Sequence, residues 1–291
     1  MVLFYERKLG LYPHVNKDGR VVHGGIPQKA NLVAHLQKVG RDVTAAIPDS
    51  GFTGNAVIDW EGWRPVWGTN WGLRRIYKKL SYKLAKRLLP HGSKRERRKL
   101  AQDQFTRSAK RFMLATLNLC KQLRPYAKWG FYGYPFCLHH GDNYCTTKHF
   151  NDKVKWLYQA STGLYPSIYL RKSRSMKQQL HRHLSIQARI LETERFANKW
   201  KPIPIYAYSR MLYDPYNTTE KSFYSKPDLC SSIKQSADLG VNGVILWGSW
   251  LSKHCTTITR LEDYHCRCRK PYKGVRCNKS TYWDYFRVFH Q

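Results

Sequence analysis

Short apolar runs alternate with longer amphipathic segments along most of this chain. Runs typical of buried strands cover residues 2–5, 55–60, 129–134, 167–170, 203–208 and 243–247. Between them, apolar residues recur with the period of an α-helix in three series: Leu73, Ile76, Leu80, Leu84 and Leu88; Phe105, Ala109, Phe112, Thr116 and Cys120; and Leu180, Leu184, Ala188 and Leu191. This alternation predicts an α/β fold with parallel strands, and a barrel is the architecture that we expect.

The run at 55–60 leads into two carboxylates, Asp59 and Glu61. Side chains two residues apart on a strand point to the same side, with Cα atoms roughly 6.5 to 7 Å apart. One carboxylate's charge then raises the pKa of the other, which predicts a general acid beside a charged neighbour. For this motif alone the structural alternative is favoured, in which the acids cap the next helix or pair with Arg64. On a barrel, however, the pair falls at the carboxyl end of a strand, where catalytic residues lie.

The chain carries 51 Lys and Arg against 19 Asp and Glu, a formal net charge of +32. This exceeds what solubility requires and favours an anionic partner: a nucleic acid, an acidic polysaccharide or an anionic membrane. No stretch reaches the roughly 18 to 20 uncharged apolar residues of a membrane span, and residues 1–7 lack the pattern of a signal peptide. The dense basic segment 93–99 predicts a loop that enters a helix, as a solvated surface or as a polyanion track.

Six motifs occur in order along the chain. They are FYERKLGLYP at 4–13, HGGIPQ at 23–28, VIDWEGWRP at 57–65, WGFYGYP at 129–135, LYPSIY at 164–169 and GVILWG at 243–248. Together they resemble the hyaluronidases of glycoside hydrolase family 56. The resemblance extends from residue 2 to about residue 256.

The resemblance implies a distorted (β/α) barrel over residues 1–258 that cleaves hyaluronan, or chondroitin, at the β-1,4 bond between N-acetylglucosamine and glucuronate. Glu61 matches the family's proton donor, and Asp59 matches the acid that orients the substrate's N-acetyl group. The nucleophile would be the acetamido oxygen of the sugar itself, with retention of configuration, which departs from the common two-carboxylate scheme. No cofactor is implied, and we expect a monomer.

Four aromatic residues match substrate-binding positions of that family. Tyr132 and Tyr169 match tyrosines of the cleaved subsite, while Tyr208 and Trp247 match the wall on which the sugar stacks. Aromatic rings cover the apolar face of a sugar, and phenol hydroxyls bind its rim.

Two further residues are candidates with less defined roles. Arg64 is a candidate to bind a substrate carboxylate or to orient the acid pair, and the interpretation that we favour is a structural salt bridge. Tyr5 is a weaker candidate for the groove.

The chain also departs from the family pattern at both ends. Family members usually begin with a signal peptide and a first strand that carries a cysteine, so we expect that this chain is truncated and lacks the first barrel strand. Residues 259–280 resemble only part of an EGF-like module, and residues 281–291 are interpreted as a tail.

By resemblance, two disulfides are expected, Cys137 with Cys145 and Cys268 with Cys277. Cys120 lies on the apolar face of a predicted helix and is expected to be a buried thiol. Three cysteines have no assigned partner: Cys230, Cys255 and Cys266. A bridge from Cys255 to Cys266 is an open alternative.

The cysteine pairs favour an oxidising compartment, so a secreted or lysosomal location is expected. Two glycosylation sequons begin at Asn217 and Asn278. The histidine clusters at 139–140 and 181–183 lack cysteine or carboxylate neighbours at zinc-site spacing, so no metal site is predicted.

Three hypotheses remain at this point. The first is an endoglycosidase that acts on hyaluronan, and the second is a polyanion-binding protein of the same fold with impaired catalysis. The third, nucleic-acid binding through charge alone, has no recognised motif behind it, so no specific nucleic-acid partner is expected.

Overall fold

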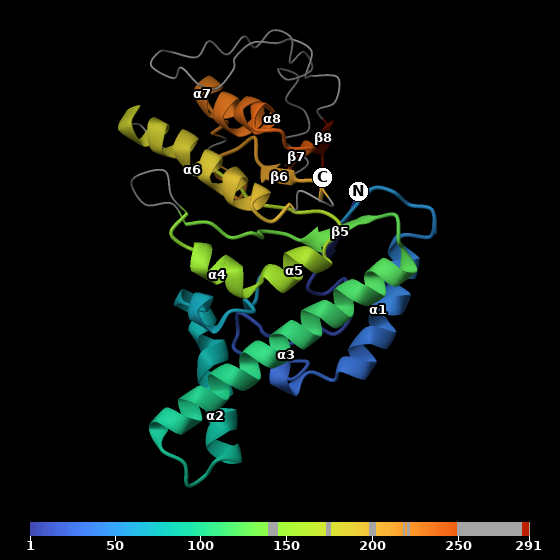
Figure 1. Cartoon of the computed structure of the whole chain (residues 1–291), viewed down its shortest axis with the longest axis vertical. Helices are drawn as coiled ribbons and strands as arrows, with labels where there is room; N and C mark the ends of the chain where they lie inside the picture. Colours follow the sequence, from blue (N-terminus) through green and yellow to red (C-terminus); the bar gives the residue numbers. More distant parts are fainter. Residues whose placement is uncertain are drawn as a thin grey trace. The chain divides into compact units, whose positions relative to one another are not determined.

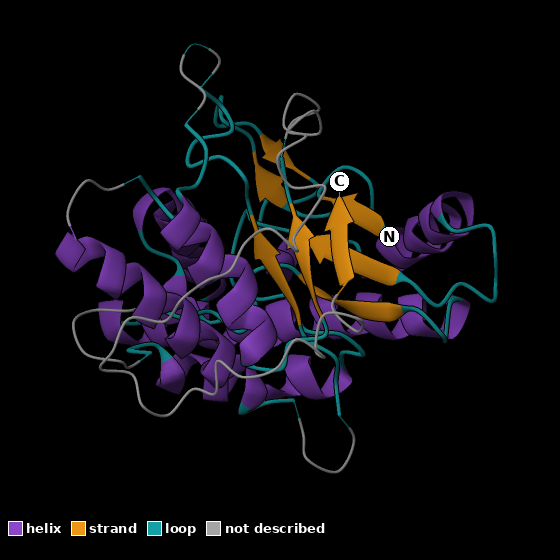
Figure 2. Cartoon of the chain, turned by 90° about the horizontal axis from the view of Figure 1, so that it is seen from above, coloured by secondary structure: helices purple, strands orange, loops and turns teal. Residues whose placement is uncertain are grey.

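The computed structural model describes residues 1–138, 145–172, 176–197, 202–217, 219, 222–248 and 287–290. The chain divides into two compact units, one of residues 1–132 and 149–162, the other of residues 133–148 and 163–291. Figure 1 is coloured along the sequence and labels the helices and the strands β5 to β8, and Figure 2 distinguishes helices from strands by colour. Each unit contains a parallel sheet.

The central strand of the first unit is β4 (Asn55–Asp59), which pairs in parallel with β1 (Val2–Tyr5) and β5 (Lys128–Phe131). The first four residues of β4 are buried. Strands buried in this way have unbroken apolar runs, which explains why the sequence predicted them. The parallel register brings Tyr5 of β1 level with Asp59 of β4.

The long helix α3 (Lys94–Leu123) forms the framework of the first unit. It begins at a capping box, in which Ser93 Oγ accepts from Glu96 N and the Glu96 carboxylate accepts from Ser93 N. The basic segment 93–99 is therefore the cap and first turn of this helix, close to what was predicted. α1 (Leu32–Ala46) and α2 (Arg75–Leu88) pack against α3 (Figure 1).

The apolar periodicity at 73–88 predicted the helix α2 correctly, but it does not mark the buried face. The buried residues of α2 are Tyr77, Ser81 and Ala85. By contrast, Leu73 is 98% exposed and Leu88 is 55% exposed. The two ends of this apolar series therefore face solvent, while Leu80 and Leu84 between them are partly buried.

Smaller elements complete this part of the chain. They are the hairpin strands β2 (His14–Val15) and β3 (Val21–Val22), the 3₁₀ turns η1 (Pro27–Lys29), η2 (Trp67–Thr69) and η3 (Gly72–Arg74), and the short helices α4 (Lys148–Lys153) and α5 (Lys155–Ala160).

The second unit contains a parallel sheet of β6 (Tyr206–Ser209), β7 (Gly243–Leu246) and β8 (Arg287–His290). Two isolated parallel bridges, Leu164 to Ile205 and Ser167 to Tyr208, add the segment 164–167 beside β6. Predicted strand 167–170 is thus represented by single bridges and not by a regular strand.

Helical segments precede β6 and connect β6 to β7 in the second unit. They are α6 (Met176–Glu194) and a run made of α7 (Lys226–Leu229), the π-helical η4 (Cys230–Lys234) and α8 (Gln235–Asp238). The interpretation of 281–291 as a tail is wrong for residues 287–290, because they form β8 and pair with β7. The α/β class with parallel strands is confirmed, while closure of a barrel and the lack of a first strand stay predictions. The EGF-like segment 259–280 lies outside the described residues.

Candidate active site

The carboxyl end of β4 presents the acid pair. Asp59 is the last residue of β4 and is partly buried, while Glu61 is exposed. Trp60 between them is 6% exposed, with its ring centroid 4.8 Å from that of Tyr12 and 5.6 Å from that of Phe131. The tryptophan therefore anchors the segment in the core, and its two acidic neighbours are the more exposed residues, as strand alternation predicts.

The carboxyl group of Asp59 has a raised pKa. Burial, together with the negative charges of Glu61 and Glu6, raises the pKa of Asp59 from 3.8 to about 7. Its buried Oδ1 atom has no hydrogen-bond partner among the described residues. The role of Glu61 as proton donor, which the sequence indicated, stays a prediction; Glu61 is exposed at this strand end.

A third carboxylate, Glu6, lies at the pair and was missed from the sequence. Glu61 N donates to Glu6 Oε1 at 3.1 Å, and Arg74 Nε donates to Glu61 O at 3.0 Å. Glu6 follows Tyr5, which is level with Asp59 in the sheet, so the parallel pairing of β1 and β4 brings it here. The available signal was its position directly after a predicted strand.

Tyr5 and Tyr132 both lie next to β4 through backbone pairing. Tyr5 is opposite Asp59 and 44% exposed, and Tyr132 N donates to Ile58 O at 2.9 Å. The structure thus brings both predicted tyrosines to the strand end that carries the acid pair.

Arg64 makes structural contacts in the turn that follows the acid pair, and the salt bridge that we favoured stays a prediction. Its guanidinium lies 5.0 Å from the ring centroid of Trp71, and Nη1 donates to Thr69 O at 3.5 Å. Its backbone N donates to Asn70 Oδ1 at 2.9 Å. These contacts order the turn that follows the acid pair.

In the second unit, Tyr169 and Trp247 meet around a cation. Their ring centroids are 6.3 Å apart, and the guanidinium of Arg210 lies 3.8 Å from the Tyr169 centroid and 5.2 Å from that of Trp247. Tyr216 adds a third ring 5.8 Å from Trp247. The sequence identified the two rings but missed Arg210, whose only signal is its place directly after β6.

Tyr208 is not part of this group. It is 1% exposed and packs edge-on against Tyr165, with centroids 6.2 Å apart. Its place inside β6 turns it into the core, so the prediction that it forms a wall for sugar is not supported by its position.

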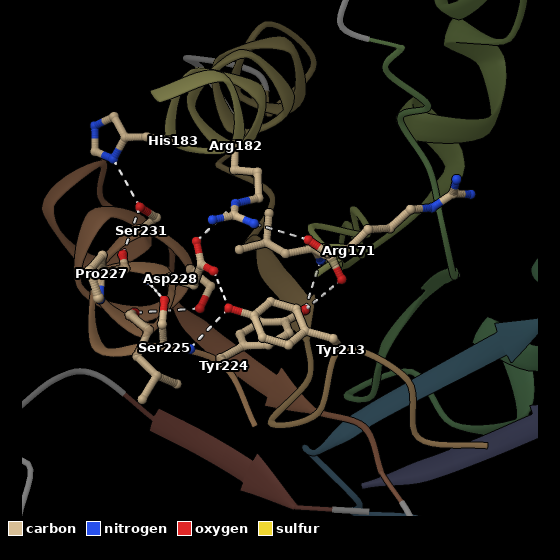
Figure 3. Close-up of polar contacts among 12 residues, drawn as sticks. Arg171, Arg182, His183, Tyr213, Tyr224, Ser225, Pro227, Asp228 and Ser231 are labelled. Atoms are coloured by element: carbon tan, nitrogen blue, oxygen red, sulfur yellow. Dashed lines mark hydrogen bonds and ion pairs between the residues drawn. The ribbon is translucent and has the colours of Figure 1, made fainter. Parts of the chain in front are cut away.

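A buried polar network supports the backbone beside Tyr169 (Figure 3). Leu170 N donates to Tyr224 Oη at 2.7 Å, and the Tyr224 ring packs on Tyr213 with centroids 4.8 Å apart. Tyr213 Oη donates to Asp228, which is fully buried. The network therefore links α7 to the segment that carries Tyr169.

Arg182 supplies the positive charge of this network. Its Nε lies 3.1 Å from Asp228 Oδ1, and its Nη1 donates to the carbonyl oxygen of Arg171 at 3.1 Å, as Figure 3 shows. The phenol of Tyr213 bonds to Asp228 Oδ2, whereas Asp228 Oδ1 and Arg182 Nε form an ion pair without a hydrogen bond. A buried carboxylate that is paired with a cation suits a structural support.

The bonding state of the described cysteines agrees with the prediction for Cys120 but not for the pair of Cys137 and Cys145. Cys120 is a fully buried free thiol, as predicted. Cys137 and Cys145 are free thiols whose side chains hydrogen-bond to each other, so the structure brings the predicted partners together without a bond between them. Cys230, which had no assigned partner, is disulfide-bonded. The predicted pair of Cys268 and Cys277 lies outside the described residues.

Of the two predicted sequons, Asn217 is exposed on the surface and Asn278 lies outside the described residues. The part of the chain that the structure describes contains no group of three potential metal ligands. The histidine pair at 139–140 lies outside that part. Within it, no helix is long and apolar enough to cross a membrane.

The model of the hyaluronidase family, glycoside hydrolase family 56, matches residues 1–280. The chain belongs to this family. Hyaluronidase-1 of Homo sapiens is 38% identical over 262 residues, which is 86% of this chain, and hyaluronidase-2 of Ovis aries is 37% identical over 286 residues, which is 94% of it. The chain spans only 58% and 59% of the length of these two relatives.

A solved hyaluronidase has a similar fold. Bee venom hyaluronidase, in complex with a hyaluronic acid tetramer, matches with a TM-score of 0.76 and 32% sequence identity, over 85% of this chain and 78% of that chain. The family that the six motifs indicated is thereby confirmed.

Proposed function

We propose that this hyaluronidase-family chain is an endo-β-N-acetylhexosaminidase that hydrolyses β-1,4 bonds of hyaluronan. The observation that carries the proposal is the acid pair at the end of β4, in which burial raises the pKa of Asp59 to about 7 beside the exposed Glu61. Support for the substrate comes from bee venom hyaluronidase, which was solved with a hyaluronic acid tetramer.

The proposed reaction uses the substrate's own acetamido group as nucleophile. Its carbonyl oxygen attacks the anomeric carbon, the bond to the leaving oxygen breaks, and Glu61 donates a proton to that oxygen. Asp59, as a carboxylate, accepts the acetamido N–H and favours the attacking geometry. Glu61 then takes a proton from water, which opens the cyclic intermediate with overall retention of configuration.

One proton suffices for the pair in this scheme. The free protein holds it on Asp59, and the reactive form carries it on Glu61, so that Asp59 can accept the acetamido N–H. Proton transfer between carboxyl groups that share a site needs no external acid. Loss of this proton at high pH removes the general acid.

Tyr169 and Trp247 are proposed to stack against sugar rings, with Tyr132 as a further contact near the acid pair. Arg210 presents a cation beside the two rings, which suits the carboxylate of a glucuronate. The paired positions of Cys137 and Cys145 suit a disulfide in an oxidising compartment, so action in a secreted or lysosomal setting is part of the proposal.

The test is the release of new reducing ends from hyaluronan by the chain and by Glu61→Gln. Activity that falls at least about 10²-fold in Glu61→Gln, as loss of a general acid predicts, supports the proposal. Glu194→Gln, which removes an exposed carboxylate on α6, is the matched control and should retain activity. Salt-sensitive binding of hyaluronan without cleavage by the unmodified chain would instead favour the catalytically impaired polyanion-binding protein.

A further inference from the structure

The positive charge of the chain is concentrated in one part of the first unit. Residues 75–111, which form α2, the turn after it and the first part of α3, contain 14 Lys and Arg against two acids. Within the described structure, the only ion pair in this stretch joins Lys99 to Asp103 at 3.6 Å, and both side chains are well exposed. The cleavage of hyaluronan proposed above assigns these cations no role.

The helix α2 arranges its side chains in two parallel ridges. Every fourth residue is an exposed cation: Arg75, Lys79, Lys83 and Arg87. The residue after each cation is apolar: Ile76, Leu80, Leu84 and Leu88. Four residues advance a helix by about 6 Å and about one turn, so both ridges follow the whole helix, about 100° apart around its axis.

The fold covers the apolar ridge only in its middle, where Leu80 and Leu84 are partly buried. α2 turns the face of Tyr77 and Ser81 to the interior. On the ridge, Ile76 is 37% exposed and Leu88 is 55% exposed, and Leu73, just before the helix, is 98% exposed. Several exposed aliphatic side chains next to a row of cations are a combination that marks an interaction surface.

We infer that α2 is a docking surface for an anionic lipid membrane, with the helix lying parallel to the membrane plane. The cationic ridge is complementary to acidic headgroups, and the aliphatic ridge enters the boundary between headgroups and acyl chains. A nucleic acid or a sulfated polysaccharide would use the cations but gain nothing from the aliphatic side chains. The two ridges together therefore favour a membrane over either polyanion.

The first turns of α3 extend the positive field beyond α2. Exposed cations there are Lys94, Arg95, Arg98 and Lys99. Because charges farther than about 8 to 10 Å away are screened at physiological salt, these residues act over short range and strengthen attraction once α2 and the start of α3 are close to the membrane. The docking surface does not depend on whether the chain cleaves hyaluronan.

The experiment is cosedimentation of the full chain with vesicles of phosphatidylcholine alone or mixed with phosphatidylserine, at physiological salt. A cation variant carries Arg75→Gln, Lys79→Gln, Lys83→Gln and Arg87→Gln, and an apolar variant carries Leu73→Ser and Leu88→Ser. A control variant removes the same charge from exposed positions elsewhere: Lys17→Gln, Lys29→Gln, Arg41→Gln and Lys155→Gln. Thermal unfolding of each variant shows that its fold is retained.

We expect binding to the mixed vesicles and not to phosphatidylcholine alone. Each cation near an anionic surface contributes roughly a fivefold gain in affinity, so the cation variant should bind at least about tenfold more weakly. The apolar variant should also lose about tenfold, because two leucines no longer leave water. The control variant should lose less than about threefold.

Three results would overturn the inference. They are equal losses in the cation and control variants, an apolar variant that binds as well as the unmodified chain, and no binding to mixed vesicles at all. Binding to heparin or DNA that depends on the cations, together with an apolar variant that still binds vesicles fully, would assign the surface to a polyanion instead.

Discussion

Asp59→Asn should make the protein more stable above neutral pH. The pKa of Asp59 lies near 7 because burial disfavours its charged form, against an ordinary value of 3.8. The folded protein therefore takes up a proton at this residue between about pH 4 and pH 7, and its stability falls as pH rises through that window. Asparagine has no charge to desolvate, and the Asp59 Oδ1 atom has no hydrogen-bond partner in the described structure to lose.

The size of the effect follows from the pKa. A pKa of about 7 in place of 3.8 corresponds to about 4 kcal/mol, since each unit is worth about 1.4 kcal/mol. Asp59 is only partly buried, so solvent and relaxation reduce this value and we expect a gain of about 2 to 4 kcal/mol at pH 8. At pH 4 the variant and the unmodified chain should differ by less than about 1 kcal/mol.

The assay is urea unfolding of both proteins at half-unit steps from pH 4 to pH 9. Asp49→Asn, which removes an exposed carboxylate, is the control and should leave the pH dependence unchanged. A difference in unfolding free energy that does not grow with pH would refute the reasoning, as would an Asp59→Asn protein that is less stable at pH 8. Activity of this variant should nevertheless be lost, because the amide no longer accepts the acetamido N–H as a carboxylate does.

Three other predictions follow from the site. Glu6→Gln keeps an oxygen that can accept from the Glu61 N–H but removes a charge that raises the pKa of Asp59. The alkaline limb of the pH profile of kcat/KM should therefore move to lower pH with little change in KM, and an unchanged profile would show that Glu6 does not raise this pKa. Asp228→Asn breaks a buried ion pair and should cost about 3 to 5 kcal/mol in urea unfolding, whereas a loss below about 1 kcal/mol would show that the network is not structural. Arg210→Gln should raise KM for hyaluronan about tenfold while kcat changes less, and an unchanged KM would argue against contact with the glucuronate.

Local periodicity was enough to predict the elements with one clear apolar pattern. The buried strand β4 was predicted because its residues form an unbroken apolar run, and α3 because its buried positions repeat with helical period. α1 was not predicted, because one of its buried positions is His35, which bonds to Leu11 N and Thr116 Oγ1. A polar residue at a core position weakens the apolar pattern, and only the fold supplies its partners.

The acid pair could be predicted from the sequence because both members lie on one strand. Glu6 could not, because it reaches Glu61 across 55 residues through the pairing of two strands. The raised pKa of Asp59 also needed the structure: spacing places the two acids together, but the main cause of the shift is the burial of Asp59, which depends on the fold. Likewise, a strand position alone did not show that Tyr208 is buried while Trp247 is partly exposed.

The central claim is tested most directly by proton NMR of hyaluronan oligosaccharides during cleavage by this chain. We predict that the new N-acetylglucosamine reducing end appears first as the β-anomer and then equilibrates, and that Glu61→Gln gives no such signal. An α-anomer as the first product would contradict the substrate-assisted reaction. Cleavage by Glu61→Gln at the rate of the unmodified chain would contradict the assignment of the proton donor.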